Sequence, residues 1–354
     1  MYRKLDRHIG LHVLLAILLV LLIITGLDML FSLLHELNEM GGDYGVPQVL
    51  WFIFLRIPGD IGELLPYAAM IGSLIGLGVL ASNNELIVMR AAGVSIARII
   101  WAVMKPTLVV LVAGMLIAEY VAPWTESRAQ GDRAVAMGSG QAVGSSHGYW
   151  LRQGSEFVHI NSVQPDGRLL GVTRYLFDDK GKLERSSFAR QAIYVKGKWQ
   201  VQDIRSTQLS DQRSTVQNQD SEPWNLALDA RLLSSAMREP ESLSIANLWG
   251  YSRYLKAQGL NSNLYRLTFW NKLLQPLVTL ALVLMAISFI FGPLRSVTLG
   301  QRIFIGVLVG FIFRIFQQLL GPTSQVLGFP PLLAVLIPIL VCTLLGVLLL
   351  RRVG

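Results

Sequence analysis

Long apolar runs are the feature of this sequence that most limits its fold. A helix needs about 20 apolar residues to cross a bilayer. Six runs are close to or beyond that length: 9–34, 50–81, 96–122, 264–291, 303–320 and 332–350. The first run is too long for the apolar core of a cleaved signal segment. Charged residues make up only 15% of the chain, whereas soluble domains carry about 25%. We therefore expect a membrane protein with six transmembrane helices.

The polar segment between the third and fourth runs has the pattern of a β domain. Apolar and polar residues alternate over four short stretches: 156–163, 171–177, 192–195 and 199–202. Turn sequences separate them, at 165–167, 178–181 and 196–198. A helical pattern returns at 244–258, where Leu248, Tyr251 and Leu255 share one face. The expected fold is a membrane α-helical bundle of six transmembrane helices with an inserted all-β, jelly-roll-like domain.

Lysine and arginine residues in the short loops predict the orientation. They occur near the N-terminus, after the second and fourth runs, and at the C-terminus: Arg3, Lys4, Arg7, Arg90, Arg98, Arg295, Arg302, Arg351 and Arg352. The loops on the other side, 35–49 and 321–331, contain neither residue. Both termini are therefore predicted to be cytoplasmic, with the β domain outside the cytoplasm. This arrangement explains the net charge of +8, and the absence of a basic and aromatic cluster argues against nucleic-acid binding.

These patterns divide the chain into three parts. Residues 1–122 hold three transmembrane helices and a short cytoplasmic helix at 83–95. Residues 123–260 hold the β domain and its helical return to the membrane. Residues 261–354 hold the other three transmembrane helices.

The cytoplasmic segment 83–95 has the pattern of a short amphipathic helix. Ser82 or Asn83 can cap its start, and Gly93 can end it. Such a helix can dock into a groove of a partner, lie on the membrane surface, or simply connect two spans. Its polar face mixes acidic and basic residues, unlike the basic face of membrane-surface helices. We therefore predict partner docking, through Glu85, Leu86, Met89, Arg90, Ala91 and Gly93.

The sequence contains no nucleotide-binding or catalytic motif. A phosphate-binding loop ends in Gly-Lys followed by Ser or Thr, but the two Gly-Lys pairs here are followed by Leu183 and Trp199. We expect no enzyme activity and no cofactor in this chain; if ATP drives it, another chain binds ATP and magnesium. His8 and His12 are four residues apart without a third ligand nearby, so no metal site is expected.

Charged and aromatic residues in or beside the apolar runs are candidate ligand contacts. Ionisable groups in a membrane span usually face a cavity, although a position near the interface also allows snorkelling. A guanidinium can bind a phosphate through two hydrogen bonds, and aromatic rings can form a wall for lipid or simply pack in the core. The candidates are Asp28, Arg128, Arg133, Arg302, Phe311, Arg314 and Phe316. We place Asp28 and Arg314 in the outer parts of their runs. Two small-residue motifs, 72–76 and 306–310, permit close helix packing, within the chain or against a partner.

Several longer motifs resemble the LptF/LptG family of lipopolysaccharide export permeases. The segment Ile287-Ser-Phe-Ile-Phe-Gly-Pro-Leu-Arg-Ser-Val297, followed by Gly300 and Arg302, is similar to the family's motif after the fourth span. The segment Glu85-Leu-Ile-Val-Met-Arg-Ala-Ala-Gly93 resembles its cytoplasmic coupling helix. Three shorter motifs also match: Leu5-Asp-Arg-x-Ile-Gly10, Val121-Ala-Pro123 and Trp270-x-Lys-x-x-Gln-Pro276. The resemblance extends over essentially the whole chain, although the β domain matches in character more than in residues.

The resemblance implies a permease subunit of an ATP-binding-cassette exporter in the Gram-negative inner membrane, with the β domain in the periplasm. It implies an LptF-type partner around a cavity open to the outer leaflet, and an LptB-type ATPase dimer that grips the coupling helices. An LptC-type single-span protein and a periplasmic LptA-type bridge would complete the system. The substrate would be lipopolysaccharide, extracted from the outer leaflet and passed toward the outer membrane.

Two departures from the family affect the lipid-contact residues. Lysines expected near the end of the first span and the start of the second are replaced by Leu27-Asp-Met29 and Pro58-Gly-Asp60. Arg314 stands where an uncharged residue is expected, and it can compensate for the missing lysines. The alternative functions are an ion-driven lipid carrier and a membrane-anchored periplasmic scaffold. A carrier needs an ionisable relay near the membrane midplane, for which Asp28 and Arg314 are the only candidates.

Overall fold

The computed structural model describes residues 2–40, 44–136, 149–163, 168–178, 181–195, 198–209, 214–224, 240–257, 259–292 and 297–352. The chain forms two compact units. The first, which we call the helical unit, contains Met1–Ser32, Ile57–Pro123 and Ser244–Gly354. The second, which we call the mixed unit, contains Leu33–Arg56 and Trp124–Leu243. The predicted turns at 165–167 and 196–197, and the motif residues 293–296, lie outside the described residues.

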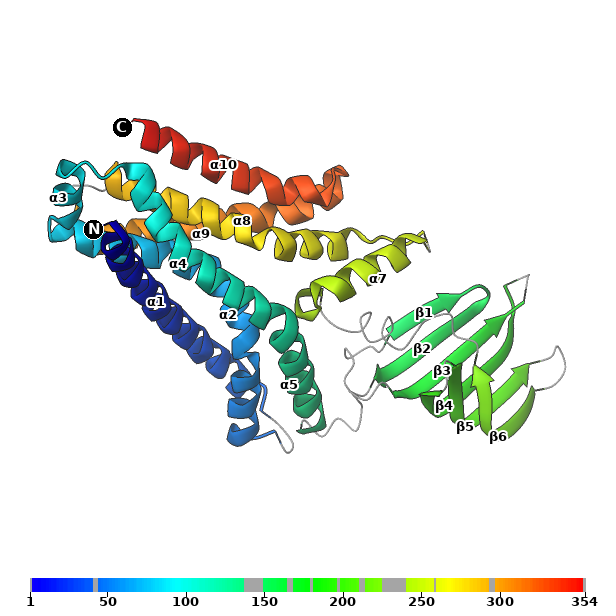
Figure 1. Ribbon diagram of the computed structural model, residues 1–354. Helices are drawn as coiled ribbons and strands as arrows, with labels where there is room; N and C mark the ends of the chain where they lie inside the picture. The colour runs from blue at the N-terminus through cyan, green and yellow to red at the C-terminus, as the bar shows by residue number, and fades with distance from the viewer. Residues whose placement is uncertain are drawn as a thin grey trace. The chain divides into compact units, whose positions relative to one another are not determined.

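Six helical segments are long and apolar enough to cross a membrane, which confirms the predicted number of spans (Figure 1). They are α1 (Tyr2–Asn38), α2 (Val46–Ser82), α4 (Ile96–Leu116) with its continuation, α8 (Asn263–Phe291), α9 (Leu299–Leu327) and α10 (Pro331–Arg351). The continuation of α4 is a π-helical turn, η1 (Ile117–Val121), followed by α5 (Ala122–Ala136). The short elements are α3 (Glu85–Ala91), η2 (Pro240–Ser242) and α7 (Ile245–Ala257).

Two prolines that follow the predicted runs 96–122 and 303–320 lie inside longer helices. The predicted end of the third span at Pro123 is wrong, because this proline is the second residue of α5, which directly follows η1 and continues to Ala136. The predicted end of the fifth span at Pro322 is also wrong, because α9 continues to Leu327 and is capped by Gly328 with φ 71°. Helix α2 also runs across Pro58 without a break. A proline removes one backbone donor, and helices in membranes tolerate this loss when the freed carbonyl finds another partner.

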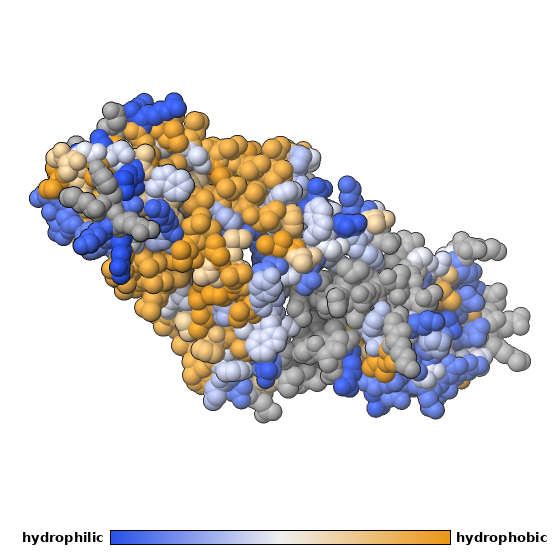
Figure 2. Space-filling view, viewed as in Figure 1, coloured by the Kyte–Doolittle hydropathy of each residue, from blue (hydrophilic) through white to orange (hydrophobic). Residues whose placement is uncertain are grey.

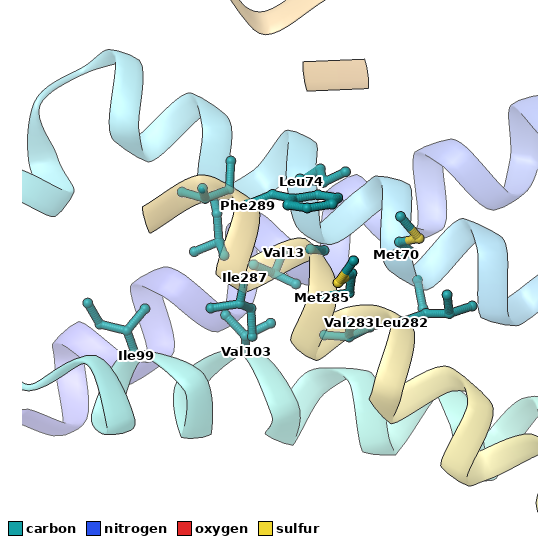
Figure 3. Packing of buried hydrophobic residues seen from close by; sticks show 14 of the residues in the cluster. Val13, Met70, Leu74, Ile99, Val103, Leu282, Val283, Met285, Ile287 and Phe289 are labelled. Atoms are coloured by element: carbon teal, nitrogen blue, oxygen red, sulfur yellow. The ribbon is translucent and has the colours of Figure 1, made fainter. Parts of the chain in front are cut away.

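The core of the helical unit is formed mainly by side chains from α1, α2, α4, α8 and α10, with smaller contributions from α3 and α9, and part of it is shown in Figure 3. Helix α8 is central, with Leu282, Val283, Ala286 and Ile287 fully buried. Helix α9 is the opposite case: only 17% of its most apolar stretch is buried, compared with 72% for that of α2. Figure 2 shows a wide apolar surface over the helices. The surface of α9 therefore has to be covered by lipid or by another chain.

Glycines in α2 allow α1 to pack against it at close range. A Cβ atom added at Gly72 would lie 2.5 Å from the Cα atom of Ile17, and one at Gly76 would lie 2.9 Å from the Cα atom of Val13. The small-residue motif at 72–76 therefore mediates packing within the chain. A Cβ atom added at Gly306 of α9 would likewise overlap the Leu74 side chain, so the second motif also packs against α2.

Gly72→Ala should therefore destabilise the protein, by about 1–3 kcal/mol, because the added methyl overlaps backbone atoms that cannot move aside. The measurement is thermal unfolding of the purified protein in detergent. Gly59→Ala in the same helix is the matched control, because nothing lies within 4 Å of its added Cβ atom and both changes raise helix propensity. Equal unfolding temperatures for the two variants would contradict the packing described here.

A carboxylate from η1 caps the helix that returns the chain to the membrane. The Glu119 Oε2 atom accepts a hydrogen bond from the backbone N–H of Ile245, at 2.9 Å, although the two residues are 126 positions apart. A negative charge is favourable at a helix N-terminus, where the backbone donors are otherwise unpaired. Helix α7 buries Leu248, Tyr251 and Leu255, as the sequence analysis predicts.

An antiparallel sheet of six strands in chain order confirms the inserted β domain. The strands are β1 (Tyr149–Gln153), β2 (Glu156–Val163), β3 (Leu169–Phe177), β4 (Leu183–Val195), β5 (Lys198–Leu209) and β6 (Ser214–Trp224). The four predicted stretches lie in β2 to β5. The edge strands β1 and β6 are missed; β6 is exposed along most of its length, so no apolar alternation marks it. Buried side chains on one face form the core: Val158, Ile160, Val172, Ala189 and Ile204 are at most 3% exposed.

Candidate functional site

Helix α3 is held on the helical unit by two apolar side chains. Leu86 and Met89 are 4% and 8% exposed and belong to the main core. They were predicted as docking residues, but in the structure their side chains point into the protein interior. Ile87 and Val88, which were not selected, are 50% and 65% exposed. The predicted docking roles stay predictions. The apolar surface that α3 offers to a partner is formed by Ile87 and Val88.

Both ends of α3 are set by backbone conformation. The predicted cap at Ser82 or Asn83 is wrong: Ser82 donates to the carbonyl of Val79 in α2, and Asn84 occupies the cap position with φ 61° and no side-chain cap. At the other end, Gly93 has φ 84°, and the amides of Gly93 and Val94 donate to the carbonyls of Arg90 and Met89. This is the αL ending that favours glycine. Arg90, Ala91 and Gly93 are all exposed.

Contacts from α1 and α4 fix the surroundings of α3. The Nε2 atom of His8 lies 2.8 Å from the Oε2 atom of Glu85, and this hydrogen bond lowers the pKa of Glu85. Two residues earlier, Asp6 accepts from Arg98 at 3.2 Å and pairs with Lys105 at 3.5 Å. The sequence analysis considered His8 only as a metal ligand and missed its contact with α3. Figure 1 shows α3, the N-terminus and the C-terminus at the same end of the helices.

An exposed ion pair joins α2 to α9. The guanidinium of Arg314 donates to Glu63 Oε1 at 2.6 Å and lies 5.8 Å from the ring centre of Tyr67. The side chains of Arg314 and Glu63 are 38% and 64% exposed. Arg314 lies near the midpoint of α9, which extends to Leu327; its place in the outer part of the span stays a prediction. The sequence analysis missed Glu63, which it counted within an apolar run.

Polar side chains continue beside this ion pair on α8 and α9. The Nε2 atom of Gln317 donates to Asn271 Oδ1 at 3.3 Å, and Gln275 of α8 donates to the backbone carbonyl of Gly62 in α2. Polar groups are expensive in hydrocarbon unless they are paired or meet water. The surface around Glu63 and Arg314 is therefore not an ordinary lipid-facing surface.

Two other predicted arginines are occupied by the chain. Arg302 is 4% exposed, and its guanidinium donates to the carbonyl of Gly78 at 2.8 Å, so it ties α9 to α2. Arg133 donates to Glu36 Oε2 at 2.9 Å. The same oxygen accepts from the Tyr44 hydroxyl, also at 2.9 Å, and burial is the main reason that the pKa of Tyr44 rises to about 12. Arg302 and Arg133 therefore have structural partners in place of a ligand.

The remaining predicted contacts are more accessible. Arg128, in the mixed unit, has a side chain 56% exposed and pairs with Asp132 at 3.7 Å. Phe311 and Phe316 of α9, in the helical unit, are 60% and 39% exposed. Asp28 of α1 is partly exposed and forms no ion pair with the described residues. Of the seven candidates, Arg314 and Phe311 lie within one turn of each other on the same helix.

These features define a multi-pass membrane protein with six spans, a short helix with an apolar exposed face between the second and third spans, and a β domain inserted between the third and fourth. The sequence matches the family "Lipopolysaccharide export system permease LptF/LptG" over residues 7–352, so the chain belongs to that family. The family and the six spans indicate a multi-pass protein of the inner membrane. Because the family includes LptF and LptG types, a permease pair is implied.

Individual relatives are similar over nearly the full length. The lipopolysaccharide export system permease protein LptG of Haemophilus influenzae is 37% identical over 341 residues, covering 96% of this chain and 95% of the relative. LptG of Escherichia coli K12 is 34% identical over 338 residues, covering 94% of each chain. LptF of Escherichia coli K12 is 26% identical over 226 residues, covering 58% of this chain and 61% of the relative.

Proposed function

We propose that this chain is the LptG-type permease subunit of a lipopolysaccharide exporter, and that ATP hydrolysis on a separate chain drives it. The observation that carries this proposal is the exposed pair of Glu63 and Arg314 near the middle of apolar helices. An ion pair at such a place requires a water-filled or protein-covered cavity. A cavity with a cationic group beside exposed aromatic rings suits an amphiphile that carries phosphate on an acylated sugar.

The proposed orientation has both termini and α3 in the cytoplasm and the β domain in the periplasm. The positions of lysine and arginine in the short loops support it. We propose that an LptB-type ATPase dimer, which would hold ATP and magnesium, docks on α3. An LptF-type chain would cover α9, and an LptC-type span and an LptA-type bridge would complete the path. This chain would contribute no cofactor and no catalytic group.

Reconstitution of the complex tests this function. The chain is purified with its permease partner from inner membranes and placed in proteoliposomes that contain lipopolysaccharide. We expect an ATPase chain to co-purify, and ATP to release lipopolysaccharide to a soluble periplasmic acceptor. Release that continues without the ATPase would overturn the proposal in favour of an ion-driven carrier. ATP hydrolysis without any lipid release would overturn the assignment of the substrate.

A further inference from the structure

One cross-strand row of the sheet combines aromatic and hydrogen-bonding side chains from all six strands. The register pairs Trp150 with His159, His159 with Thr173, Thr173 with Phe188, Phe188 with Arg205, and Arg205 with Asn218. Directly opposed residues in antiparallel strands have their side chains on the same face. We call these six residues the aromatic row.

The aromatic row lies on the accessible face of the sheet. Trp150 and Phe188 are 60% and 47% exposed, and Arg205 and Asn218 are also exposed. The residues next to them in sequence, such as Val158 and Ile204, are buried on the opposite face. Because the hydrophobic core lies on that opposite face, formation of the core does not explain large exposed rings in this row.

Three rings on this face lie close together. The Trp150 ring lies 4.8 Å from the His159 ring, and it stacks on Tyr175 at 5.9 Å with an angle of 19° between the planes. Tyr175 belongs to the next row, opposite Phe157. Three strand spacings separate Trp150 from Phe188, which is about 14 Å. The surface is therefore longer than one sugar ring and has the length of a short oligosaccharide.

We propose that the aromatic row binds the sugar part of lipopolysaccharide. A pyranose ring has faces with C–H bonds, which stack on aromatic rings, and a rim of hydroxyl groups, which Thr173 and Asn218 can hydrogen-bond. Arg205 forms no ion pair with the described residues, so its guanidinium is available to a phosphate or carboxylate on the sugars. This inference rests on the proposed function, because it takes the substrate to be a glycolipid.

The test is photocrosslinking in the intact permease complex in membranes. A benzoylphenylalanine replaces Phe188, and the probes are lipopolysaccharide with a complete core oligosaccharide and lipopolysaccharide truncated after its innermost sugars. We expect crosslinking to the complete form and a loss of about 2- to 10-fold with the truncated form, the size of an aromatic contact. Trp150→Ala should give a similar loss with the complete form, and Trp150→Phe should restore most of it.

Two control positions separate the possible failures. Gln208 is exposed on the opposite face of β5, and crosslinking from a photocrosslinker placed there should not depend on the sugars. A photocrosslinker at Phe311 in α9 should capture both forms, because both carry the lipid. Equal capture of the two forms at position 188, or capture of a polypeptide there, would overturn sugar binding by the aromatic row while leaving the proposed function intact. A failure at position 311 as well would overturn the proposed function itself.

Discussion

Val88→Asp should abolish binding of the ATPase chain while leaving the permease folded. Val88 is the most exposed large apolar residue of α3, at 65%, so its replacement does not disturb the core. A carboxylate forced into a desolvated apolar groove costs several kcal/mol, which corresponds to at least a 100-fold loss of affinity. The measurements are co-purification of the ATPase and ATP turnover of the complex.

Two further variants define what a positive result means. Val88→Leu keeps the surface apolar and should bind normally. Met89→Asp places the same charge on the buried side of α3, and it should lower the unfolding temperature as well as binding. Glu85→Lys is a less specific probe, because it also removes the hydrogen bond with His8. Normal ATPase binding by Val88→Asp would show that α3 does not dock through its exposed apolar residues.

Changes to the two partners of the ion pair between α2 and α9 should have opposite effects on lipid binding. Arg314→Ala should lower photocrosslinking of lipopolysaccharide to position 311 by about 10-fold, the value of one charge-assisted hydrogen bond. Glu63→Gln should raise it, because the carboxylate that competes for the guanidinium at 2.6 Å is gone. Assembly with the permease partner, followed by co-purification, should be unchanged in both variants.

The matched control is Gln318→Ala, which removes an exposed polar side chain from the same helix. It should have little effect, since Gln318 carries no charge. If Arg314→Ala and Glu63→Gln both lower crosslinking, the ion pair supports the structure of the cavity without binding an anion. If neither changes it, lipopolysaccharide does not reach this part of α9.

The number of spans could be predicted because it depends on length and hydropathy, but several boundaries could not. Pro123 and Pro322 are strong local stop signals, yet both lie inside continuous helices. The cost of one missing donor is local, whereas the gain from extending a packed apolar helix comes from tertiary contacts. Gly93 was predicted correctly because the positive φ that it supplies is a local requirement.

The candidate sites show the same division between local and tertiary information. Spacing alone placed Leu86 and Met89 on one face of α3, but not whether that face is turned inward. The partner of Arg314 lies 251 positions away in the sequence, and no periodic pattern connects the two. The polar strand β6 lacks an apolar face because it is an exposed edge, so its pairing with β5 is the only signal of its existence.

The hydrogen bond between Glu119 and Ile245 gives the chain a modular construction. It joins the place where the chain leaves the bundle to the place where it returns, so the inserted segment starts and finishes at one fixed anchor. The entropy of closing a loop grows slowly with its length. Insertions or exchanges between these two points should therefore be tolerated by the bundle, and the inserted module can change in evolution while the membrane bundle stays the same.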